Sequence, residues 1–145
     1  MNLPSPSAVI VGLAVALGIG LVIGTERERR KGDGDRRAAA GLRTFAIVAL
    51  TGAIAQALPA AALVPIGGTL VAALAAVSHW KSRSPDPGMT TEIALFATYL
   101  IGVLCVVEPG LGAACGMGLA LLLAARRRLH RFATQLLSEQ ELHDG

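Results

Sequence analysis

The chain has 145 residues, of which 53% are hydrophobic, 16% charged and 3% aromatic, and its formal net charge is +3. Because soluble domains carry about 25% charged residues, this composition excludes an ordinary soluble globule and a disordered chain. Both cysteines, Cys105 and Cys115, lie in apolar runs, which excludes a disulfide framework. The predicted class is an integral membrane protein.

Five charge-poor segments predict membrane-spanning helices in an all-α bundle. They cover Ala8–Gly24, Thr44–Pro59, Leu63–Trp80, Thr91–Val107 and Leu111–Ala125. A bilayer core needs about 20 helical residues, so the first and third segments are long enough and the last two are short. Glu108-Pro109-Gly110 interrupts the last two segments, and Pro59 and Pro65 separate the second from the third. The pattern predicts one leading helix followed by two helical hairpins.

Basic residues decide the predicted orientation. With five spans, every arginine and lysine falls on one side of the membrane: Arg27, Arg29, Arg30, Lys31, Arg36, Arg37, Arg43, Lys81, Arg83, Arg126, Arg127, Arg128 and Arg131. Because cytoplasmic connections carry the excess of Lys and Arg, we predict the N-terminus outside and the C-terminus in the cytoplasm. The net positive charge therefore marks a membrane face, and no nucleic-acid partner is expected.

The sequence divides into a transmembrane domain at residues 1–128 and a cytoplasmic amphipathic tail at residues 129–145. Apolar residues of the tail recur at helical spacing from Leu129 to Leu137, so the fifth span is expected to continue as an amphipathic helix. Ser138-Glu139-Gln140-Glu141 then has the pattern of a capping box, which normally opens a new helix. Either the tail frays there or it begins a longer C-terminal region, and the pattern favours the second.

Two pairs of glycines have the spacing of helix-packing motifs. Gly20 and Gly24 stand four residues apart in the first span, and Gly112 and Gly116 in the fifth. Small residues at this spacing let two helix backbones approach closely within a membrane. The favoured interpretation is packing within the chain, and a homo-oligomer seam is the alternative.

Charged residues gather where the first span ends and the second begins. Glu26, Arg27 and Glu28 close the first span, and Arg43 opens the next. Carboxylates at the edge of a membrane are costly unless they are paired, so we expect Arg43 to pair with Glu26 or Glu28, and Glu26 with Arg30 one helical turn later. Salt bridges are the favoured interpretation, and a site for a cation, a phosphate or a partner protein is the alternative.

The start of the fourth span belongs to the same predicted layer. Thr90 or Thr91 is expected to cap the helix, and Glu92 lies in its first turn, where the helix dipole favours an anion. A hydrated magnesium ion needs only one or two protein carboxylates, so Glu26 and Glu92 are the candidate metal ligands if there is a metal. The histidines form no zinc pattern, and no nucleophile has a base beside it, so we expect neither an enzyme nor a resident cofactor.

Two motifs together resemble the MgtC/SapB family of bacterial membrane proteins: GLVIGTERERR at Gly20–Arg30 and AGLRTF at Ala40–Phe45. TTEIA at Thr90–Ala94 and the tail resemble the branch in which such a domain heads a longer multispanning protein. The family motif falls on Gly20, Gly24, Glu26, Arg27, Gly41, Arg43 and Thr44.

The resemblance implies a multi-pass helical bundle of the bacterial inner membrane that is linked to growth at low magnesium. A regulatory role through membrane-protein partners and magnesium transport are the two competing activities. Transporters usually place ionisable groups near the midplane, whereas these spans offer only Thr51, Gln56, Thr69, Ser78, Thr98 and Tyr99. We therefore expect a non-enzymatic, partner-binding protein, with an ion transporter or transporter subunit as the alternative. The candidate partner or ion site consists of Glu26, Arg27, Glu28, Arg43, Thr44, Thr91 and Glu92.

Overall fold

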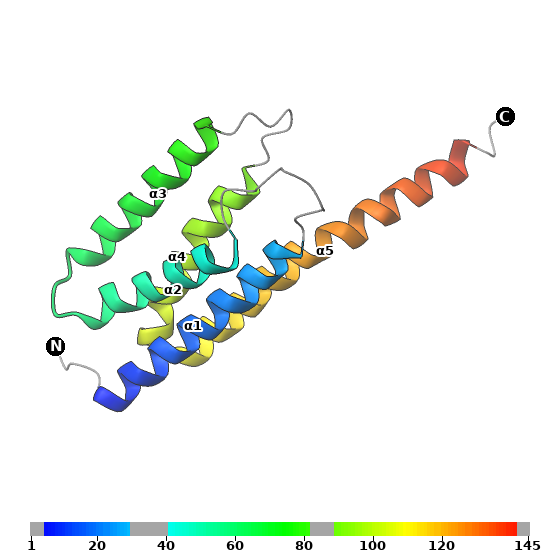
Figure 1. The fold of residues 1–145 in the computed structure, drawn as a ribbon. Coiled ribbons are helices and arrows are strands. Elements are labelled where there is room, and N and C mark those ends of the chain that lie inside the picture. The colour runs from blue at the N-terminus through cyan, green and yellow to red at the C-terminus, as the bar shows by residue number, and fades with distance from the viewer. Residues whose placement is uncertain (1–4, 30–40, 82–88, 142–145) are drawn as a thin grey trace.

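A computed structural model describes residues 5–29, 41–81 and 89–141 of the chain. These residues form five helices: α1 (Pro6–Glu28), α2 (Leu42–Ala57), α3 (Leu63–Lys81), α4 (Thr90–Val107) and α5 (Pro109–Glu141) (Figure 1). The described residues contain no strand, so the prediction of an all-α bundle is confirmed. The predicted pairing of Glu26 with Arg30 lies outside the described residues, because Arg30 is not among them.

The helices have the length and hydropathy of a membrane bundle. By length and composition, α1, α3 and α4 are each able to cross a membrane. Helix α2 and the Pro109–Ala125 part of α5 are apolar but shorter. The inside and outside assignment of the two chain ends stays a prediction.

Helix α4 is the centre of the bundle and contacts each of the other four helices. Helix α3 lies at one edge and packs against α2 and α4, as Figure 1 shows. Helices α1 and α5 lie side by side, and α5 continues beyond the ends of the others (Figure 1). This arrangement brings the end of α1, the start of α2, the end of α3 and the start of α4 to the same end of the bundle.

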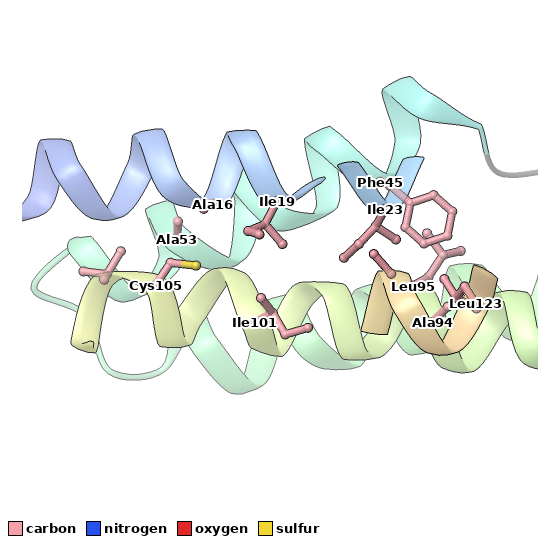
Figure 2. Close-up of a cluster of buried hydrophobic side chains, with 12 residues drawn as sticks. Ala16, Ile19, Ile23, Phe45, Ala53, Ala94, Leu95, Ile101, Cys105 and Leu123 are labelled. Atoms are coloured by element: carbon pink, nitrogen blue, oxygen red, sulfur yellow. The ribbon is translucent and has the colours of Figure 1, made fainter. Parts of the chain in front are cut away.

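The core lies between α1, α2, α4 and α5 and consists mostly of small and branched side chains (Figure 2). Ala16 and Ile23 of α1, Phe45 of α2 and Cys105 of α4 are fully buried there, and Leu123 of α5 is nearly so. Lipid gives helices no hydrophobic driving force to associate. The close van der Waals packing of these side chains therefore holds the bundle together.

The four predicted packing glycines all face a neighbouring helix of the same chain. A Cβ added at Gly20 would lie 2.8 Å from the Ala46 Cα, and one at Gly24 would lie 2.7 Å from the Leu42 Cα. At Gly112 the obstacle is the Cα of Cys105 at 2.8 Å, and at Gly116 it is the side chain of Ile19. These positions are occupied by contacts within the chain, as the favoured interpretation of the sequence expects.

Two local expectations were wrong, and a third was confirmed. Pro65 does not separate two helices but lies in the first turn of α3, where a missing backbone N–H costs nothing. The predicted interruption between the last two spans is confirmed at Glu108, and Pro109 already begins α5. The capping-box pattern at Ser138 does not begin a new helix, since α5 continues without a break to Glu141. A capping box acts only where its first residue leaves helical geometry.

Candidate functional site

Four helix ends meet at one end of the bundle (Figure 1), and these ends carry several polar and charged side chains. The ends of α1 and α3 come together there with the starts of α2 and α4. We call this set of side chains the charged rim, and it comprises Glu26, Arg27, Glu28, Arg43, His79, Thr91 and Glu92.

Arg27 joins α1 to α4. Its terminal guanidinium nitrogen donates a hydrogen bond to the Thr91 hydroxyl oxygen, across 64 residues of sequence and in a partly buried position. The prediction that Thr90 or Thr91 caps α4 was wrong, because Met89 is the N-cap and no side chain caps the helix. The Thr91 hydroxyl instead accepts a charge-assisted hydrogen bond from another helix, which is stronger than a neutral one.

Glu28 joins α1 to α2. Its carboxylate oxygen accepts a hydrogen bond of 3.3 Å from the backbone N–H of Leu42, the first residue of α2. The N-cap of α2 is Gly41, which provides no side chain for this purpose. The first N–H groups of a helix have no partner within it, so a carboxylate from α1 satisfies one of them and also complements the helix dipole.

Arg43 and Thr44 stand in the first turn of α2, next to that contact. Arg43 is exposed, and in the part of the chain that the structure describes it forms no ion pair. The expected pairing with Glu26 or Glu28 is therefore absent, and Glu28 meets the start of α2 through a backbone N–H instead. Thr44 is half-buried, and its backbone N–H donates to the Gly41 carbonyl.

His79 joins α3 to α4 through Glu92. The His79 Nδ1 atom lies 3.4 Å from the Glu92 Oε1 atom, and both side chains are largely shielded from solvent. The second oxygen, Oε2, is buried and has no hydrogen-bond partner among the described residues. Sequence reasoning missed this pair. The sequence does hold a signal for it: His79 stands two residues before the end of α3, and Glu92 stands two residues after the start of α4. Residues at such matching positions lie opposite each other in an antiparallel helical hairpin.

The described residues hold no group of three or more His, Cys, Asp or Glu side chains placed to bind a metal ion. Magnesium needs fewer protein ligands than that. The assignment of Glu26 and Glu92 as metal ligands therefore stays a prediction.

The polar side chains within the spans bond to the bundle itself. The hydroxyls of Thr51, Thr69 and Thr98 each donate to the carbonyl four residues earlier in their own helix, at 2.7 to 2.8 Å. The Tyr99 hydroxyl donates to the Val64 carbonyl at 2.8 Å and so ties α4 to α3. These four are among the six polar residues that the sequence offered for a pathway through the membrane.

Comparison with known families decides the identity of this bundle. The sequence model of the MgtC family matches residues 13–132. The chain belongs to the MgtC family. The match includes every residue of the charged rim and all four packing glycines, and it confirms the family resemblance seen in the motifs. Curated proteins and solved structures give no match to this MgtC-family chain.

Proposed function

We propose that this MgtC-family protein is a non-enzymatic, regulatory protein of the bacterial inner membrane, and that its charged rim binds a partner protein when magnesium is limiting. Family membership supports a membrane protein linked to magnesium physiology. The excess of basic residues at this end supports a cytoplasmic position for the charged rim.

The exposure of Arg43 is the observation that carries the proposal. Arg27, Glu28 and Glu92 each contact a neighbouring helix, whereas Arg43 has no ion pair within the described residues and points away from the core. An arginine presents five N–H donors in a rigid fork that suits a carboxylate of another protein. The contacts of the charged rim therefore hold four helix ends together around an arginine that stays available to a partner.

The transporter alternative has less support. Between their end turns, α1 to α4 contain no Asp, Glu, Lys, Arg or His, and a transport pathway usually needs charged groups near the midplane. The hydroxyls at Thr51, Thr69, Thr98 and Tyr99 already donate within the bundle.

Site-specific crosslinking in living cells tests the partner proposal. A photoreactive residue replaces either Ile47, which is exposed on α2 one helical turn after Arg43, or Leu58, which is 49% exposed at the opposite end of α2 and serves as the matched control. We expect a discrete crosslinked protein at position 47 under magnesium limitation and none at position 58. Arg43→Ala should weaken pull-down of the same protein and slow growth at low magnesium while leaving the amount of folded protein unchanged. The proposal fails if Arg43→Ala leaves folding, pull-down and low-magnesium growth all unchanged.

A further inference from the structure

An open groove of about 480 Å³ lies between α3 and α4. Ala72, Ala75 and Ala76 form its α3 wall, and Ile93 and Phe96 lie on its α4 wall. The alanine side chains are short and leave the space of the groove unfilled. The α3 wall runs from the membrane-spanning part of the helix toward the charged rim.

The end of the groove at the charged rim is polar. His79, Trp80 and Glu92 line it. His79 engages only the Oε1 atom of Glu92, and the Oε2 atom is buried without a hydrogen-bond partner among the described residues. A buried carboxylate oxygen without a donor is costly. The groove therefore combines an apolar wall with a carboxylate group at its polar end.

Charges of both signs stand at this end of the groove. Glu92 provides the negative charge, and Lys81, the residue after Trp80 at the end of α3, is exposed and provides a positive one. Trp80 is 88% exposed, and tryptophan is enriched at the level of lipid headgroups in membranes. A zwitterionic headgroup that contains an ammonium and a phosphate complements this pair of charges.

We propose that the groove binds a phospholipid whose headgroup carries a primary ammonium, that is, a phosphatidylethanolamine. One acyl chain lies against the alanines of α3 and against Ile93 and Phe96. The ammonium donates a hydrogen bond to the Glu92 carboxylate, and the phosphate lies on the side of Lys81. A choline headgroup has no N–H to donate, and an anionic headgroup without an amine would bring negative charge to the carboxylate.

The size of the groove favours a lipid over a helix of a partner protein. A helix has a diameter of about 10 Å and a pitch of 5.4 Å, so a volume of about 480 Å³ would hold roughly one helical turn. That volume lies within the range of about 300–1,000 Å³ that small-molecule sites occupy. One turn of a helix would leave the rest of that helix outside the groove.

The single tryptophan of the chain, Trp80, reports on the groove directly. The purified full chain is reconstituted in phosphatidylcholine vesicles that contain the same small fraction of a lipid with brominated acyl chains, either phosphatidylethanolamine, phosphatidylcholine or phosphatidylglycerol. Bromine quenches tryptophan fluorescence at short range. We expect brominated phosphatidylethanolamine to be enriched beside Trp80 about tenfold over brominated phosphatidylcholine, which corresponds to about 1.4 kcal/mol.

Two pairs of variants separate the headgroup contact from the apolar wall. Glu92→Gln should abolish the preference for phosphatidylethanolamine, whereas Glu108→Gln, at an exposed carboxylate at the other end of α4, should keep it. Ala76→Leu should reduce quenching by brominated phosphatidylethanolamine to the level of phosphatidylcholine, because it fills the groove. Ala73→Leu, on an exposed face of α3 outside the groove, should not.

Several results would overturn the proposal. Equal quenching of the wild type by phosphatidylethanolamine and phosphatidylcholine would show that the headgroup is not recognised. A preference for phosphatidylglycerol would show an anion site instead. Quenching that rises on dilution of the protein in lipid, with no dependence on the headgroup, would show that a second copy of the chain occupies the groove.

Discussion

Replacement of Gly102 by alanine tests the central packing contact of the bundle. A Cβ at Gly102 would overlap the carbonyl oxygen of Ala49 on α2 and lie 2.8 Å from its carbonyl carbon and 3.1 Å from its Cα. Non-bonded carbons sit about 3.5–4.0 Å apart, so α2 and α4 would have to separate by at least about 0.7 Å to clear the carbonyl carbon, and further to clear the oxygen. A gap of that size forfeits about a quarter to a half of the dispersion energy of each contact. The obstacle is backbone, which cannot move aside as the end of a side chain can.

The expected loss of stability follows from these distances. Overpacking of this kind costs about 3 kcal/mol at the upper end of its usual range. Replacement of a glycine by alanine within a helix stabilises the folded state by about 0.5–1 kcal/mol. Gly102→Ala should therefore lower the free energy of unfolding by about 2 kcal/mol. Reversible unfolding of the purified chain by SDS in mixed micelles, followed by circular dichroism, measures this quantity.

Two other glycines provide a graded control for Gly102→Ala. Gly118 has nothing within 4 Å of an added Cβ, so Gly118→Ala should be neutral or slightly stabilising. At Gly116 the obstacle is the side chain of Ile19, so Gly116→Ala should fall between the two. If Gly102→Ala unfolds like Gly118→Ala, the close approach of α2 and α4 is wrong.

Two further substitutions test polar contacts between helices by the same unfolding measurement. Thr91→Val removes the acceptor of the Arg27 hydrogen bond and should cost about 2 kcal/mol, whereas Thr51→Val, whose hydroxyl bonds only to its own helix, should cost less than about 0.5 kcal/mol. Equal effects would refute the role of Arg27. Gly67→Ala places a methyl group against the Tyr99 hydroxyl, so its cost should fall by about 1 kcal/mol in a Tyr99→Phe background. Additive effects would contradict the contact between α3 and Tyr99.

The existence and limits of the helices followed from the sequence because the signals for them are local. Apolar runs bounded by charges, Pro59 and Glu108 predicted five segments that match the helices closely. The wrong expectations concerned how residues behave in context: Pro65 fits the first turn of α3, and Ser138 stays helical because nothing before it breaks α5.

The packing of the helices could be predicted only in part. Both the lipid-facing and the core-facing sides of a span are apolar, so hydrophobicity does not show which side packs. Ala16 is fully buried whereas its neighbour Leu17 is 40% exposed. Small residues carry the information instead, which is why Gly20 and Gly112 marked contact faces while the central position of α4 was not predicted.

The charged rim, like the helix packing, could be predicted only in part. The sequence placed Glu28, Thr91 and Glu92 at one end of the bundle, because charges interrupt the apolar runs there. Their partners depend on how the helix ends are arranged in space, so the Arg27–Thr91 hydrogen bond replaced the expected cap and His79 joined Glu92. The Arg27–Thr91 contact has no signal in the local sequence, and the signal for the His79–Glu92 pair lies only in the matching positions of the two residues at the end of α3 and the start of α4.

Magnesium flux into proteoliposomes tests the central claim most directly. The purified chain is reconstituted as the wild type, Glu26→Ala and Glu92→Ala, and influx is compared with that of empty vesicles. A regulatory, partner-binding protein predicts no influx above empty vesicles for any of the three. Influx through the wild type that is lost in either variant would contradict the claim and identify a transporter with its ion site at the charged rim.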